Sequence, residues 1–102
     1  MKEYTISYLP IFDADLAETW RYIAIDLHNP AAADRLILDT EKAILKRLEN
    51  PVSFEKYHSK KEREYPYYRI HIRNFIVWYV VIDNVMEVRR FLYSKRDTEA
   101  FL

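Results

Sequence analysis

The sequence has 102 residues, equal numbers of acidic and basic side chains, and neither cysteine nor glycine. Half of the residues are hydrophobic and 16% are aromatic, which excludes a disordered chain. Without cysteine there is no disulfide framework or thiolate zinc site, and no apolar run approaches the roughly 18 residues of a membrane span. We therefore expect one cytoplasmic domain over residues 1–102, with no metal, no cofactor and no membrane contact.

The first half of the sequence predicts a strand followed by two helices. Residues 4–9 are rich in β-formers, and Pro10 then ends the strand and opens a helix that runs to Leu27. Asn29 is the expected N-cap of a second helix, which ends near Leu48. Because the joint is short, the helices should form an antiparallel hairpin. The positions expected to face the core are Phe12, Leu16, Trp20, Ile23 and Leu27, then Ala33, Ile37, Thr40, Ile44 and Leu48.

The second half predicts a basic loop and three strands. Residues 52–66 show no hydrophobic period, and strands are expected over about 67–73, 75–82 and 85–93, with a hairpin turn at residues 83–84. The middle strand is apolar on both faces and should therefore be central. The order β-α-α-β-β-β predicts an α+β domain, in which the helical hairpin packs on a twisted, mainly antiparallel four-stranded sheet.

A row of cations is expected on one face of this sheet. Strand side chains alternate between faces, so Tyr67, Arg69, His71 and Arg73 should lie together, while the intervening aromatic and aliphatic side chains face the core. Such a row suits phosphate or a carboxylate-rich partner. A lone strand histidine is commonly a surface or packing residue, but the flanking arginines make a functional role equally credible.

The charges also divide along the chain. Residues 1–40 carry three basic and seven acidic side chains, whereas residues 41–102 carry thirteen and nine. This asymmetry indicates a cationic functional face opposite an acidic side. On charge counts alone, a mixed surface that only maintains solubility is the simpler interpretation.

Short motifs occur along the whole chain in a characteristic order and spacing. They are Leu9-Pro10, Asp15-Leu16, Trp20-Arg-Tyr-Ile-Ala24, Asn29-Pro30-Ala-Ala-Ala-Asp34-Arg35 and Glu87-Val-Arg-Arg90-Phe-Leu-Tyr93-Ser-Lys-Arg96-Asp97. Together with the element order they resemble the RelE/ParE superfamily of bacterial toxins from type II toxin–antitoxin modules. The resemblance implies a small cytoplasmic toxin that a co-expressed antitoxin holds inactive.

The superfamily divides by target: RelE-like members cut mRNA in the ribosomal A site, and ParE-like members poison DNA gyrase. For the nuclease branch, the resemblance implies catalytic roles for His71, Arg73 and Arg96. It also implies substrate binding by Arg69, which matches a basic position of the first sheet strand. Independently of the resemblance, the basic loop and the basic tail predict phosphate contacts by Lys60, Lys61, Arg63 and Lys95. Two positions depart from the nuclease branch. That branch has an arginine near the position of Ile76 and a tyrosine at the C-terminal end, where this chain has Phe101-Leu102.

Three functions remain open at this point. The Arg69-to-Arg73 row favours ribosome-dependent mRNA cleavage slightly over gyrase inhibition, and a decayed toxin that only binds antitoxin is the third alternative. The expected partner is an antitoxin whose acidic, apolar segment covers the basic sheet face and packs along the helical hairpin. Other features are expected to be structural: Arg90 as an ion pair with an acidic helix residue, Arg89 as a solvated side chain, and Trp20 and Trp78 as core residues.

Overall fold

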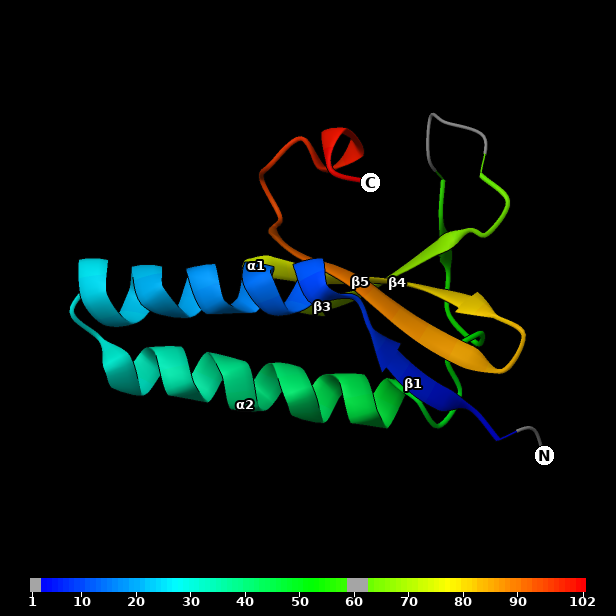
Figure 1. Cartoon of the computed structure of the whole chain (residues 1–102), viewed down its shortest axis with the longest axis horizontal. Coiled ribbons are helices and arrows are strands. Elements are labelled where there is room, and N and C mark those ends of the chain that lie inside the picture. Colours follow the sequence, from blue (N-terminus) through cyan, green and yellow to red (C-terminus); the bar gives the residue numbers. More distant parts are fainter. Residues whose placement is uncertain (1–2, 59–62) are drawn as a thin grey trace.

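The computed structural model, which describes residues 3–58 and 63–102, places a helical hairpin on one side of a five-stranded sheet (Figure 1). The elements are β1 (Thr5–Tyr8), α1 (Pro10–Arg21), a π-helical turn (Tyr22–Asp26), α2 (Pro30–Arg47), β2 (Lys56–Tyr57), β3 (Tyr67–Ile72), β4 (Phe75–Ile82), β5 (Val85–Tyr93) and a 3-10 turn (Thr98–Ala100). The predicted α+β architecture is confirmed. The expected count of four strands is wrong, because β2 lies within the predicted loop and is too short to show any alternation.

The sheet has the strand order β1-β5-β4-β3-β2, in which β1 is parallel to β5 and the other pairs are antiparallel. The central position predicted for β4 is confirmed, since its alternate side chains are buried in two separate clusters on opposite faces. The predicted turn at residues 83–84 is also confirmed. Asp83 adopts the positive φ of 55° that this turn needs in a chain without glycine.

The second helix begins as predicted. Pro30 is its first residue, and the side-chain oxygen of Asn29 accepts a hydrogen bond of 3.2 Å from the backbone N–H of Ala32. Ala33, Thr40 and Ile44 are buried as expected, and the Thr40 hydroxyl donates to the carbonyl of Leu36 at 2.7 Å. In the described residues we find no helix long and apolar enough to span a membrane.

The first helix departs from its prediction toward its end. Regular helix stops at Arg21 and continues as a wider π-helical turn, so Leu27 is 53% exposed instead of buried. Trp20 is 37% exposed, and its indole N–H donates to Asp34 at 2.8 Å. Each four-residue step along a helix rotates by about 40°, so Trp20 lies about 80° from the direction of buried Phe12. The apolar stripe therefore leaves the core before the helix ends.

Two apolar clusters lie on opposite faces of the sheet. The first joins both helices to β3, β4 and β5, and Phe12, Ile44 and Tyr79 are among its most deeply buried side chains. The second cluster contains Tyr67, Ile76, Trp78, Val80 and Leu92, with Tyr57 and Leu102 packed against it. We call the two surfaces the helix face and the open face. The prediction that Trp78 is a core residue is confirmed, on the open face.

Candidate functional site

Arg69 and His71 lie on the open face, as their alternation in β3 predicts. The guanidinium of Arg69 is 5.0 Å from the ring centroid of Tyr57, so the two side chains form a cation–π contact. His71 is exposed and has no hydrogen bond, ion pair or ring contact with any other described residue. The imidazole is accessible to solvent, and no neighbour in the described part of the chain orients it.

Arg73 does not continue this row. Strand β3 ends at Ile72, and Arg73 forms a two-residue turn with Asn74, with a φ of 52°. Its guanidinium makes an ion pair of 2.6 Å with Asp39 of α2. The prediction that Arg73 shares one face with Arg69 and His71 is therefore wrong, because strand alternation stops where the chain turns back into β4.

A β-bulge also interrupts the alternation in β5. Trp78 pairs with Arg90 and Tyr79 with Val88, which leaves Arg89 without a partner in β4. Arg89 donates to Glu87 at 2.6 Å and to the hydroxyl of Tyr67 at 3.3 Å. It is therefore held by the sheet rather than solvated, which corrects the sequence-based expectation.

The bulge places Arg90 opposite Trp78, and the guanidinium of Arg90 contacts α1. Its Nε and Nη2 donate to the two carboxylate oxygens of Asp15 at 2.8 and 2.9 Å, and the backbone N–H of Phe91 donates to the same carboxylate at 3.0 Å. These hydrogen bonds from Arg90 to Asp15 raise the pKa of Arg90. The predicted ion pair with an acidic helix residue is confirmed, and it ties α1 to β5.

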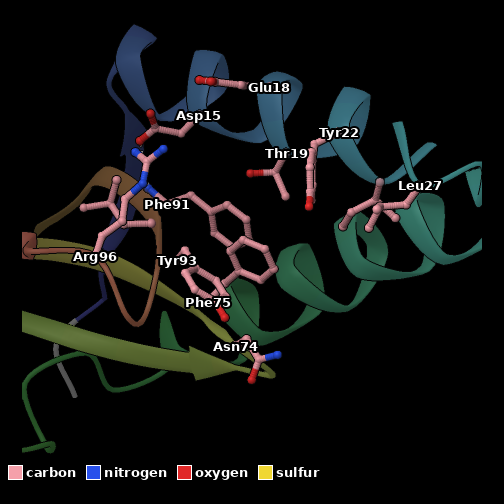
Figure 2. Close-up of a pocket in the computed structure, with 12 residues that line it drawn as sticks. Asp15, Glu18, Thr19, Tyr22, Leu27, Asn74, Phe75, Phe91, Tyr93 and Arg96 are labelled. Carbon is pink, nitrogen blue, oxygen red and sulfur yellow. Dashed lines mark hydrogen bonds between the residues drawn. The ribbon is translucent and has the colours of Figure 1, made fainter. Parts of the chain in front are cut away.

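An open groove of about 620 Å³ lies beside this ion pair, between α1 with its π-helical turn and the ends of β4 and β5 (Figure 2). Its lining residues are Asp15, Glu18, Thr19, Tyr22, Ile23, Leu27, Asn74, Phe75, Phe91, Leu92, Tyr93 and Arg96. Phe75 and Phe91, which both line the groove, have stacked rings with centroids 5.0 Å apart. We call it the aromatic groove. Sequence reasoning missed this groove. One signal could have indicated it, because Glu18 and Tyr22 are four residues apart and therefore lie on the same side of the predicted helix.

Arg96 and Lys95 occupy the turn that follows β5. Both are exposed, and Arg96 lines the aromatic groove while its guanidinium lies 5.1 Å from the ring centroid of Phe101. Lys60 and Lys61, expected to bind substrate, lie outside the described residues. The predicted site is therefore divided among a strand, a turn and the segment after β5.

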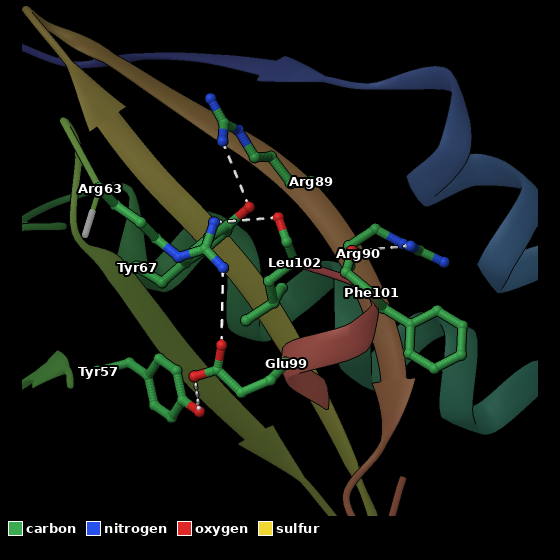
Figure 3. Close-up of polar contacts among 8 residues, drawn as sticks. All are labelled: Tyr57, Arg63, Tyr67, Arg89, Arg90, Glu99, Phe101 and Leu102. Atoms are coloured by element: carbon green, nitrogen blue, oxygen red, sulfur yellow. Dashed lines mark hydrogen bonds and ion pairs between the residues drawn. The ribbon is translucent and has the colours of Figure 1, made fainter. Parts of the chain in front are cut away.

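The C-terminal residues fold back over the open face (Figure 3). Glu99 accepts a hydrogen bond of 2.8 Å from Tyr57 and forms an ion pair of 3.7 Å with Arg63. Arg63 also donates to the backbone oxygen of Leu102 at 3.0 Å, and burial followed by the bond to Glu99 raises the pKa of Tyr57. Arg63, expected to contact substrate, thus holds the C-terminal segment in place. The sequence contains no periodic signal for this contact between distant residues.

Comparisons with known proteins agree with this architecture. A family model described as "ParE toxin of type II toxin-antitoxin system, parDE" matches residues 6–98. A solved structure titled "Chromosomal ParDE TA system from P. aeruginosa" is similar in fold, with a TM-score of 0.75 and 12% sequence identity over 91% of this chain and 98% of that chain. The search of curated proteins gave no match. Because the family model covers nearly its whole length, the chain belongs to the ParE toxin family of type II toxin–antitoxin systems.

Proposed function

We propose that this toxin acts by binding a protein target, DNA gyrase, and not by cutting mRNA. The observation that carries the proposal is the state of the three residues assigned to cleavage. Arg73 is paired with Asp39, Arg96 lies over Phe101, and His71 has no orienting neighbour among the described residues. Attack by a ribose 2′-hydroxyl requires a positioned base and cations directed at the phosphate. Membership of the ParE family supports the same choice, since the resemblance implies gyrase for ParE-like members.

The aromatic groove is the surface that we assign to the target. Its lining combines aromatic side chains, of which Tyr22 and Tyr93 are exposed, with acidic and basic residues, a composition typical of protein–protein contact sites. Tyr22 is 53% exposed, and Tyr93 is exposed on the opposite wall. A partner side chain that entered between them would bury aromatic area without displacing the ion pair between Arg90 and Asp15.

The antitoxin is the second expected partner. We keep the proposal that its acidic, apolar segment covers the open face, because Arg63 and Tyr57 already bind a carboxylate there. The chain's own Glu99 and Leu102 occupy those positions. An antitoxin segment would therefore have to extend or replace the contacts of the C-terminal residues.

Ribosome-dependent mRNA cleavage is the second candidate function. It is favoured by one observation, the shared position of Arg69 and His71 on the open face. In this alternative His71, Arg73 and Arg96 are the catalytic residues, and Arg63, Arg69 and Lys95 bind substrate together with Lys60 and Lys61. Binding of RNA would require Arg73 and Arg96 to leave their present partners.

Induced expression in cells separates the two candidates. We expect gyrase–DNA cleavage complexes to accumulate while mapped mRNA ends remain unchanged, and coexpression of the antitoxin should reverse the arrest. New mRNA ends inside codons, with gyrase unaffected, would contradict the proposal and favour the nuclease.

A further inference from the structure

The π-helical turn after α1 changes which side chains face the aromatic groove. In this turn the backbone N–H of Leu27 donates to the carbonyl of Tyr22 at 3.0 Å, five residues back along the chain, whereas a regular helix uses the fourth residue back. The turn therefore holds about one residue more than a regular helical turn. The side chains that follow it are displaced by about one position around the helix.

A regular helix would direct a carboxylate into the groove at this point. Side chains four residues apart lie nearly in line on a helix, and Glu18 and Tyr22, which have this spacing, both line the groove. The next side chain in the row would be Asp26. Instead Leu27 lines the groove, while Asp26 is exposed outside it. The π-helical turn thus replaces a charge with an aliphatic side chain on this wall.

The helix does not need the π-helical turn in order to end. His28, with a φ of 53°, already adopts the left-handed conformation that commonly stops a helix, and Asn29 then caps α2. The turn also leaves Leu27 53% exposed, where it adds little to the stability of the free protein. Single π-helical turns occur frequently at functional sites. The placement of Leu27 in the groove is therefore the consequence that we connect with function.

The two ends of the aromatic groove differ in chemistry. Figure 2 shows Asp15 and Arg96 at one end, where Arg90 binds the carboxylate of Asp15, and Tyr22 and Leu27 toward the other. Both Tyr22 and Leu27 are 53% exposed. An apolar side chain of a partner would bury aromatic and aliphatic area against them. Since Asp26 is outside the groove, this contact would not remove its carboxylate from water.

We infer that the π-helical turn adapts this end of the groove to one apolar side chain of the toxin's target, which Tyr22 and Leu27 contact. The inference rests on the proposed function, because that proposal assigns the groove to DNA gyrase. It adds the chemistry of the gyrase residue, which is aliphatic or aromatic and not cationic. The two toxin residues determine specificity, because a target with a charged side chain at this position would bury that charge without a partner.

Two exchanges that preserve composition test the inference on the full chain. The first, Asp26→Leu with Leu27→Asp, places the carboxylate in the groove and the leucine outside it. The second, Ile25→Asp with Asp26→Ile, is the matched control at two exposed positions outside the groove. We expect the first to raise the toxin concentration that inhibits gyrase supercoiling by at least about 30-fold, and the second to change it by less than about twofold. Both should melt with the wild type, since the three positions are exposed.

Leu27→Ala separates the lost contact from the added charge. It removes apolar area only and should weaken inhibition by about tenfold. Growth arrest is measured with the same variants, because it reports the contact whatever the target is. A wild type that arrests growth without inhibiting gyrase would refute the proposed function, and the order of the variants in growth arrest would still decide the inference. The inference is overturned if Leu27→Ala is as potent as the wild type, if the control exchange is as damaging as the first, or if the wild type is inactive in both assays.

Discussion

The two faces of the sheet are covered in different ways. On the helix face, α1 and α2 bury side chains such as Phe12 and Ile44 almost completely. On the open face, a short C-terminal segment is held by a few polar contacts, chiefly those of Glu99 with Tyr57 and Arg63. Regions with few buried contacts open at lower free energy than a packed core. The helix face should therefore determine stability, and the open face is the surface whose contacts a partner can exchange.

Ile44→Ala tests the role of the helix face and should have the largest effect. Ile44 is 0% exposed and belongs to the first cluster, and the cavity left by its side chain should lower the free energy of unfolding by about 2–5 kcal/mol. Leu45→Ala is a matched control on the adjacent, exposed position, and should change it by no more than about 0.5 kcal/mol. Urea unfolding of both variants measures the difference. Similar losses in the two would contradict this assignment.

Glu99→Ala tests the open face and should act locally. It leaves the hydroxyl of Tyr57 and the guanidinium of Arg63 without the carboxylate, at a cost of about 1–2 kcal/mol. Hydrogen exchange should accelerate in residues 97–102, and the fluorescence of Trp78, which is in the same cluster as Leu102, should change. Glu55→Ala, at an exposed position, is the control. If Glu99→Ala lowered the free energy of unfolding as much as Ile44→Ala does, the two faces would be equally important for stability.

Alkaline pH should produce the smallest and most gradual change in the free energy of unfolding. Tyrosines on both faces of the sheet should contribute to it. Burial raises the pKa of Tyr79 on the helix face and of Tyr57 on the open face above the ordinary value of 10.0. Above pH 10 the unfolded chain therefore loses these protons first, and the free energy of unfolding falls as pH rises through the folded pKa values. Unfolding curves between pH 8 and pH 11 measure the decline, and Tyr57→Phe should reduce its slope. A stability that rises over this range would contradict the assignment.

Features set by neighbouring residues could be predicted from the sequence. The Asn29 cap, the central strand and the turn at Asp83 all depend on local propensity and on hydrophobic period. The misplaced residues depend on events that periodicity does not encode. The bulge at Arg89 shifts the facing of β5, and the early end of β3 sends Arg73 to Asp39. The contact of Glu99 with Arg63 joins segments 36 residues apart, and no local pattern marks it.

The most direct test of the proposed function is a DNA supercoiling assay with purified gyrase, run with the wild-type toxin and with His71→Gln. A binding toxin requires no titrating group at residue 71, so both proteins should inhibit supercoiling at similar concentrations and leave mRNA on programmed ribosomes intact. The contrary result is clear: gyrase unaffected by the wild type, mRNA cut on the ribosome, and cutting slowed on the order of 10²–10⁴-fold by His71→Gln, as expected when a general base is lost.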